Sequence, residues 1–149
     1  MKLLLDTNVL VDYYARRMLF WEDTLKLRIA EHFGDVELWV SAQSFSDIEY
    51  ILRKAIPIGE LREMFAESAQ FLKICGVSTA DVHEAFQSGW PDLEDCLIAC
   101  AAKRVKADYL ITRDKKGFSR STVPVMSPRE FISWFQRSHG IEYEELRLA

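Results

Sequence analysis

The sequence contains no long hydrophobic run. Spanning a bilayer takes roughly 20 consecutive apolar residues, and no stretch of the chain approaches that length. The apolar run at 2–5 is stopped by Asp6, which makes it too short for the hydrophobic region of a signal peptide. We therefore expect a cytoplasmic protein that does not associate with membranes.

Cysteine, histidine and glycine are also scarce, and none of them forms a binding motif. The three histidines and the three cysteines, Cys75, Cys96 and Cys100, lack the close pairing that is typical of zinc sites. An odd number of cysteines argues against a disulfide framework, so we interpret them as small buried side chains. The six glycines form neither GxGxxG nor GxxxxGK, which argues against the common dinucleotide- and NTP-binding enzymes.

Length and composition indicate one ordinary globular domain. The chain has 149 residues, of which 49% are hydrophobic and 28% are charged. Its formal net charge of −4 argues against binding nucleic acid through charge alone. This objection weakens if the acidic side chains gather at one site, because a bound cation would then dominate the local charge. The positions of the acids therefore matter more than their number.

Hydrophobic patterns predict strands that alternate with helices along the whole chain. We expect short apolar strands at 2–5, 36–40, 74–77, 108–112 and 123–126. We expect helices at 9–15, 18–33, 46–55, 59–73, 79–88, 92–105 and 128–136, with Ser44 capping the third of them. This alternation favours an α/β fold, a three-layer α/β/α sandwich with a central, mainly parallel sheet. The domain would span residues 1–136, and residues 137–149 would form a C-terminal tail that is acidic after Gly140.

Acidic residues follow the expected strands or open the helices after them. Asp6 comes directly after the first strand, and Asp114 follows the fourth. Asp47 lies near the start of the helix after the second strand, and Asp95 lies in the first turn of the helix at 92–105. Open α/β sheets bind ligands at the carboxyl ends of their strands, so the fold would bring the four acids to one edge. Mg²⁺ and Mn²⁺ prefer oxygen ligands, and the four carboxylates therefore predict a metal site.

Each of these acids also has a local structural explanation. Asp6 could cap the helix that follows it, and Asp114 could be the Asx residue of a turn. Asp47 and Asp95 each lie three residues after a residue that could cap a helix, as in a capping box. Taken singly, each acid is explained best by its local role. The arrival of all four at one sheet edge is what favours the metal site.

Four segments of the sequence together resemble the PIN domain family. They are LLLDTNVLVD at 3–12, SAQSFSDIEYILRK at 41–54, DLEDCLIACAAKRVKADYLITRD at 92–114 and VPVMSPREF at 123–131. The resemblance extends to about Phe135 and is strongest to the prokaryotic VapC-like branch, which includes the toxins of VapBC toxin–antitoxin pairs. It implies a three-layer α/β/α fold and a metal-dependent endoribonuclease that cleaves single-stranded RNA with Mg²⁺ or Mn²⁺.

The resemblance also implies roles for the acids. Asp6, Asp95 and Asp114 would bind the metal, and Asp47 would complete the catalytic set. The family more often has glutamate at that last position, so Asp47 is a shorter arm that could shift the metal geometry. Glu49 is a nearby substitute, but two residues along a helix point to different sides, so we favour Asp47.

Other residues would support the acids or the substrate. Asn8 and Thr112 match polar positions that support the acids or the attacking water in the family. Arg53, Arg113 and Lys115 lie near the motif segments and could contact the RNA backbone, although a solvated surface explains each of them at least as well. The branch further implies an antitoxin protein as partner and a homodimer.

Two other functions remain open. A PIN-like domain could keep these acids and act as an RNA- or protein-binding module with little or no catalysis, and the aspartate at position 47 and the negative net charge leave room for this. An aspartyl-phosphate phosphotransferase also has an aspartate after its first strand. It normally needs a second aspartate two residues later, where this chain has Asn8.

Overall fold

Five short strands form the centre of the computed structural model, which describes residues 1–143. They are β1 (Lys2–Leu5), β2 (Glu37–Ser41), β3 (Leu72–Cys75), β4 (Tyr109–Ile111) and β5 (Val125–Met126). They pair in the order β3-β2-β1-β4-β5, and every pair is parallel. Strands covered on both faces should be apolar, and the central strand β1 is buried from Leu3 to Leu5.

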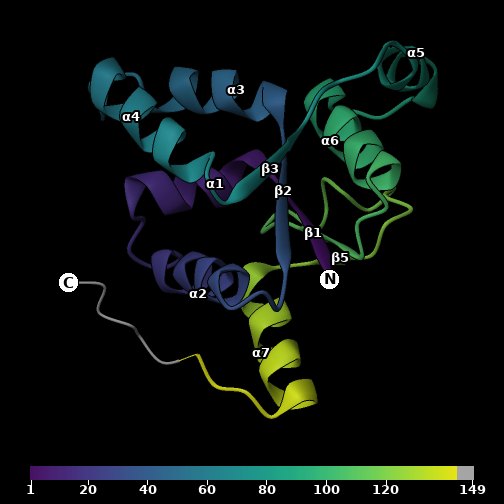
Figure 1. Ribbon diagram of the computed structural model, residues 1–149. Coiled ribbons are helices and arrows are strands. Elements are labelled where there is room, and N and C mark those ends of the chain that lie inside the picture. The colour runs from purple at the N-terminus through teal and green to yellow at the C-terminus, as the bar shows by residue number, and fades with distance from the viewer. Residues whose placement is uncertain (144–149) are drawn as a thin grey trace.

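Helices cover both faces of this sheet, as Figure 1 shows. They are α1 (Thr7–Ala15), α2 (Trp21–His32), α3 (Ala42–Leu52), α4 (Ile58–Ser68), α5 (Thr79–Ser88), α6 (Leu93–Arg104) and α7 (Pro128–His139). Successive side chains of a strand point to opposite faces. Leu3 and Leu5 accordingly pack into the larger hydrophobic core, under α1 to α4 and α7, while Leu4 packs into the smaller core under α6. The expected three-layer α/β/α architecture is confirmed.

The start of α3 differs from the sequence prediction. The helix begins at Ala42, directly after β2, and Ser41 occupies its N-cap position without a side-chain capping bond. Ser44 is therefore inside the helix and does not cap it. It is buried, and its Oγ lies 2.9 Å from Oγ1 of Thr7 in α1. The Ser44 hydroxyl group therefore links α3 to α1 and does not cap α3.

Other boundaries also differ from the prediction, and the ends of α4 and α7 show the reasons. The helix expected at 59–73 ends at Ser68, because Leu72 and Lys73 pair with β2 as the first residues of β3. Helix α7 continues to His139, beyond the expected end at 136, and Gly140 ends it with a left-handed φ of 62°.

The chain after α7 begins by packing back onto the domain. Ile141 and Tyr143 join the larger core, and the Tyr143 hydroxyl donates a 2.6 Å hydrogen bond to Oδ2 of Asp35. The rest of the predicted acidic tail, residues 144–149, lies outside the described residues. Among the helices that the structure describes, none is both long and apolar enough to cross a membrane.

The sheet order places the carboxyl ends of β1 and β4 side by side. The backbone N–H of Asp6 donates a 2.9 Å hydrogen bond to the carbonyl oxygen of Ile111, so the two chain segments leave the sheet together. On the opposite side of β1, strand β2 leads directly into α3. The first acid is thus flanked by the segments that carry the others, as expected for a parallel sheet.

Candidate functional site

Asp6 is held at the end of β1 by a neighbouring threonine. The residue is 2% exposed and occupies the N-cap position of α1, but its side chain makes no capping bond. Its Oδ2 accepts a 2.8 Å hydrogen bond from Oγ1 of the buried Thr112. The same threonine oxygen accepts a 3.0 Å hydrogen bond from the backbone N–H of Asp114. Thr112 therefore links the acid after β1 to the acid after β4, and its supporting role in the reaction stays a prediction.

Gly117 leaves the space in which two carboxyl groups meet. Its backbone N–H donates a 2.9 Å hydrogen bond to Oδ1 of Asp114, which forms the expected turn. A methyl group in place of the Gly117 hydrogen would lie 2.9 Å from Cγ of Asp114 and 3.1 Å from Oδ2 of Asp95. Such distances are too short for ordinary packing. The missing side chain thus lets Asp95 and Asp114 share one space.

The sequence suggested that Asp95 could belong to a capping box, but only Asp92 caps the helix with its side chain. Asp92 is the N-cap of α6, and its Oδ1 accepts a 3.0 Å hydrogen bond from the backbone N–H of Asp95. The reciprocal bond of a capping box is not formed. The Asp95 carboxyl group instead experiences the charges of Asp92, Asp6 and Asp114. Asp92 caps the helix, and Asp95 faces the other acids.

Asp47 reaches this group through Glu94, a residue that was not among the sequence-predicted site residues. The side chains of Asp47 and Glu94 are neighbours across α3 and α6, and Glu94 also contacts the Thr7 side chain and lies near Asp6. Oδ2 of Asp47 is buried and has no hydrogen-bond partner within residues 1–143. The one sequence signal for Glu94 is its place beside Asp95 in the first turn of α6. The alternative Glu49 instead pairs with Arg62, 3.1 Å away on an exposed side of α3.

Burial and crowding make these carboxyl groups difficult to ionise. Burial raises the pKa of Asp6 to about 6, and the Thr112 hydrogen bond opposes this effect. Burial also raises the pKa of Asp95 to about 7, and the charges of neighbouring acids add to the effect. The pKa values of Glu94 and Asp47 are raised as well, chiefly by burial. Unbalanced negative charge of this kind is relieved by a bound cation.

The donor set suits a hard divalent cation. All the candidate ligands are carboxylate oxygens, one of them is buried without a partner, and the space beside Gly117 is open to two others. Among the described residues, no three acidic, histidine or cysteine side chains are already arranged as a metal-binding group. The carboxyl groups therefore lie near one another, but they do not surround a single point as the ligands of a bound metal ion do. Of the acids, Asp6, Asp95 and Asp114 are brought together most directly.

The remaining predicted residues lie in three different surroundings. Asn8 is exposed in the first turn of α1, and its supporting role stays a prediction. Arg113 and Lys115 flank Asp114 in the chain, but each is already paired, Arg113 with the buried Asp12 and Lys115 with an exposed glutamate. Arg53 lies over the Tyr50 ring beside a separate hollow between α3 and α4.

Comparison with known proteins agrees with this architecture. The toxin–antitoxin complex from Klebsiella pneumoniae contains a chain with 20% identity and a TM-score of 0.60, covering 84% of this chain and 96% of that one. A chain of VapBC2 from Rickettsia felis, bound to a promoter DNA fragment, has 19% identity and a TM-score of 0.64, with 85% and 98% covered. A chain of FitAcB from Neisseria gonorrhoeae has 17% identity and a TM-score of 0.63, and the alignment covers 85% of this chain and 98% of that one. At these identities the similarity concerns the fold. No curated protein sequence matches the chain.

The sequence itself matches the family model described as "PIN domain" over residues 2–116. The matched range contains Asp6, Asp47, Asp95, Asp114 and Thr112, and it includes strands β1 and β4. PIN domains are generally nucleases. With its matching fold and more than half of its length covered, the chain belongs to the PIN domain family.

Proposed function

We propose that this protein is a metal-dependent endoribonuclease that cleaves phosphodiester bonds of single-stranded RNA, and that it acts in the cytoplasm as the toxin of a toxin–antitoxin pair. The observation that supports it best is the arrangement around Thr112, which ties Asp6 to the segment of Asp114 beside the carboxyl group of Asp95. A domain that used these acids only as caps and turn residues would have no need to bury them against one another, because each burial raises a pKa.

Asp6, Asp95 and Asp114 would hold Mg²⁺ or Mn²⁺. When bound, the ion would lower the pKa of a coordinated water and offset the charge of the phosphate in the transition state. Thr112 orients Asp6 by donating to one oxygen and leaving the other available. Asp47 has a buried oxygen without a partner among residues 1–143, and we assign it to accept a hydrogen bond from the attacking water. Glu94 lies beside it, so the two carboxyl groups could together provide the reach of the glutamate that is usual in the family.

The partner is proposed from the structural neighbours, which include a toxin–antitoxin complex from Klebsiella pneumoniae and VapBC2 from Rickettsia felis. We infer that this chain likewise binds an antitoxin protein, and we propose a homodimer from the family resemblance alone. A basic side chain from the antitoxin, inserted among the acids, would relieve the same like-charge repulsion as a metal ion does. Inhibition would then result from competition between the antitoxin side chain and the metal ion for the same acidic site.

Titration with Mn²⁺ by calorimetry tests the proposal without knowledge of the RNA target. We expect saturable binding to the wild type, loss of binding in Asp6→Asn, and unchanged binding in the control Glu49→Gln, which removes an exposed carboxylate from α3. RNA cleavage should follow the same pattern. If wild type and Asp6→Asn behave alike toward Mn²⁺, the acids do not form a metal site and the binding-module alternative is favoured.

A further inference from the structure

A basic hollow lies beside the acids, and the proposed acid chemistry does not use it. It measures about 340 Å³ and is bounded by the loop before α2, the loop after β4 and the start of α7. Three cationic side chains and two acidic ones line it together with an aromatic ring, namely Arg113, Lys115, Arg129, Asp23, Glu130 and Phe20. The hollow therefore has a net positive lining in a protein whose overall charge is negative.

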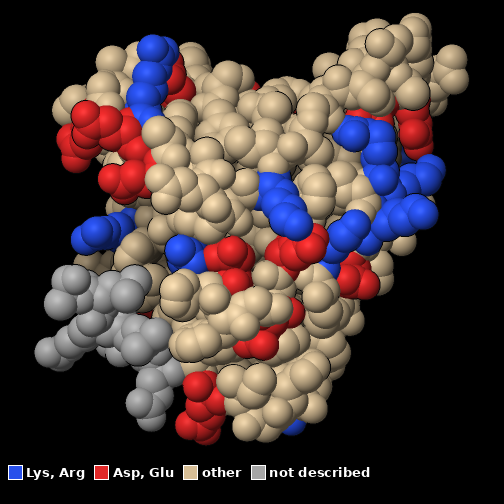
Figure 2. Space-filling view, in the orientation of Figure 1, with Lys and Arg blue, Asp and Glu red and all other residues tan. Residues whose placement is uncertain are grey.

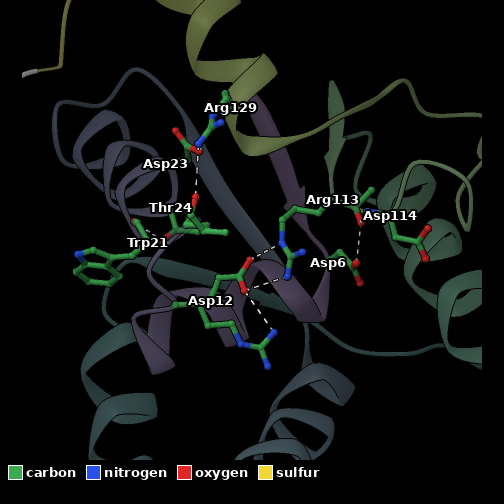
Figure 3. A network of polar contacts seen from close by, with 11 residues as sticks. Asp6, Asp12, Trp21, Asp23, Thr24, Arg113, Asp114 and Arg129 are labelled. Atoms are coloured by element: carbon green, nitrogen blue, oxygen red, sulfur yellow. Dashed lines mark hydrogen bonds and ion pairs between the residues drawn. The ribbon is translucent and has the colours of Figure 1, made fainter.

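Arg113 is fixed in this hollow by a buried carboxylate. Its Nε and Nη2 donate hydrogen bonds of 2.7 and 3.1 Å to the two oxygens of Asp12, which is fully buried in α1. The guanidinium carbon Cζ lies 3.7 Å from the centre of the Phe20 ring. Figure 3 shows the side chain stretched from the loop after β4 toward Asp12. A fixed arginine loses little conformational entropy when it binds a ligand, and its Nη1 group lies outside the bonds to Asp12.

The hollow lies next to the acids along the chain. Arg113 and Lys115 are the chain neighbours of Asp114 on either side, and the charge of Arg113 acts on Asp6. A nucleic-acid strand with one phosphate at the acids therefore passes close to the hollow. Figure 2 shows acidic and basic side chains alternating across the middle of one face instead of forming a field of one sign. A polyanion needs such local cations, because the net charge of −4 repels it.

The other two cations are available for exchange. Lys115 pairs with Glu130 at 2.9 Å, and Arg129 pairs with Asp23 at 3.1 Å, and in both pairs the basic side chain is more than half exposed. The Lys115–Glu130 pair is exposed on both sides and should contribute roughly 0–1 kcal/mol, so a phosphate can take over Lys115. Arg129 has its Nη1 group outside its bonds to Asp23 and to the Leu19 carbonyl, so it can contact a phosphate directly. Glu130 keeps a second role when Lys115 turns away, because it forms the capping box of α7 with Ser127.

We propose that the hollow of Arg113, Lys115 and Arg129 binds a backbone phosphate of the single-stranded RNA next to the one that is cleaved. This inference rests on the proposed ribonuclease function and names where its substrate is gripped. Contacts of this kind position a strand and carry no sequence information. The hollow should therefore strengthen binding of all RNA sequences alike.

The test compares two arginines in matched surroundings. Arg129 has a side chain that is 73% exposed and pairs with Asp23 at 3.1 Å, while Arg62 is 64% exposed and pairs with Glu49 at 3.1 Å beside the α3–α4 hollow. We would measure the fluorescence anisotropy of a short fluorescein-labelled RNA of mixed sequence in EDTA, between about 50 and 200 mM salt. Thermal melts and Mn²⁺ calorimetry on each variant check that fold and acid site are intact.

We expect Arg129→Gln to bind the RNA roughly tenfold more weakly, the lower end of the range for a hydrogen bond to a charged group. The slope of log K against log salt should fall by about 0.7, the value for one phosphate contact of a single strand. Lys115→Gln should behave alike, and Arg62→Gln should match the wild type. Equal weakening by Arg62→Gln and Arg129→Gln, no weakening by Arg129→Gln, or no RNA binding by the wild type would each overturn the inference.

Failure of this inference is distinct from failure of the proposed function. If the RNA data overturn the hollow while wild type still binds Mn²⁺ and loses it in Asp6→Asn, the nuclease site stands and the substrate is gripped elsewhere. If Mn²⁺ binding does not depend on Asp6, the proposed function fails, whatever the hollow does.

Discussion

The metal-free stability of Asp6→Asn is the most direct test of how the acids are arranged. Burial raises the pKa of Asp6 from 3.8 to about 6 in the folded protein. The folded state therefore binds the proton more tightly than the unfolded state does. The stabilising contribution of the protonated group is fully present below about pH 4 and is lost as the pH rises through about 6. Above that pH the folded protein carries a buried carboxylate that the unfolded chain would solvate.

The size of this effect follows from the pKa difference. Each pKa unit corresponds to about 1.4 kcal/mol, so the ionised Asp6 lowers the free energy of unfolding by about 3 kcal/mol above pH 7. Asparagine keeps an oxygen that can accept the Thr112 hydrogen bond and removes the charge. In EDTA at pH 8 we expect Asp6→Asn to be more stable than the wild type by up to about 3 kcal/mol. At pH 4 this gain should vanish.

Urea denaturation followed by circular dichroism at the two pH values measures this difference. Glu49→Gln is the control, because Arg62 lowers the pKa of Glu49 and the loss of that carboxylate should not stabilise the protein at pH 8. Mn²⁺ at about one thousand times its Kd should reverse the order of wild type and Asp6→Asn, since a ligand at that concentration contributes about 4.1 kcal/mol to the folded state, which exceeds the advantage of the variant. If Asp6→Asn is less stable than the wild type at pH 8 in EDTA, Asp6 is a structural residue and the reasoning from crowded charge is refuted.

Two further substitutions test the geometry of the site. Gly117→Ala should displace the Asp114 carboxyl group and weaken Mn²⁺ binding roughly tenfold to a hundredfold with little change in stability, because the clashing atoms belong to side chains. The control Gly76→Ala points into open space, and wild-type Mn²⁺ affinity in both variants would contradict the shared space beside Gly117. Asp12→Asn removes the carboxylate that balances Arg113 and should lower the free energy of unfolding by about 3 kcal/mol in urea denaturation. A loss below about 1 kcal/mol would mean that this pair behaves like an ordinary surface ion pair.

The sheet and its layers could be predicted because their cause is local. A strand covered on both faces needs a short apolar run ended by a polar turn, and 2–5 and 108–112 show this pattern without ambiguity. The boundary between α4 and β3 could not be predicted in the same way. Leu72 extends the apolar spacing of the helix, and only pairing with β2, aided by the 3.0 Å ion pair between Lys73 and Glu37, makes Leu72 and Lys73 a strand.

The residues that sequence reasoning missed depend on contacts between distant segments. Asp12 is a carboxylate within the apolar stretch VLVDYY, which signals that a buried partner must exist. Nothing in the spacing says that this partner is Arg113, which lies 101 residues later. Glu94 lies beside Asp95 in the first turn of α6, and that position alone does not predict a place in the site. It is included in the site because α3 brings Asp47 against it.

The local and the functional explanations of the acids are not alternatives in this structure. Asp92 caps α6, and this leaves the carboxyl group of Asp95 free to face the other acids. Asp114 uses Oδ1 to close the turn at Gly117, while its carboxyl group still borders the space that Asp95 shares. Capping and turn bonds hold the backbone that carries the site. A sequence pattern that matches a cap or a turn therefore does not argue against a metal ligand, because one carboxylate has two oxygens and can serve both purposes.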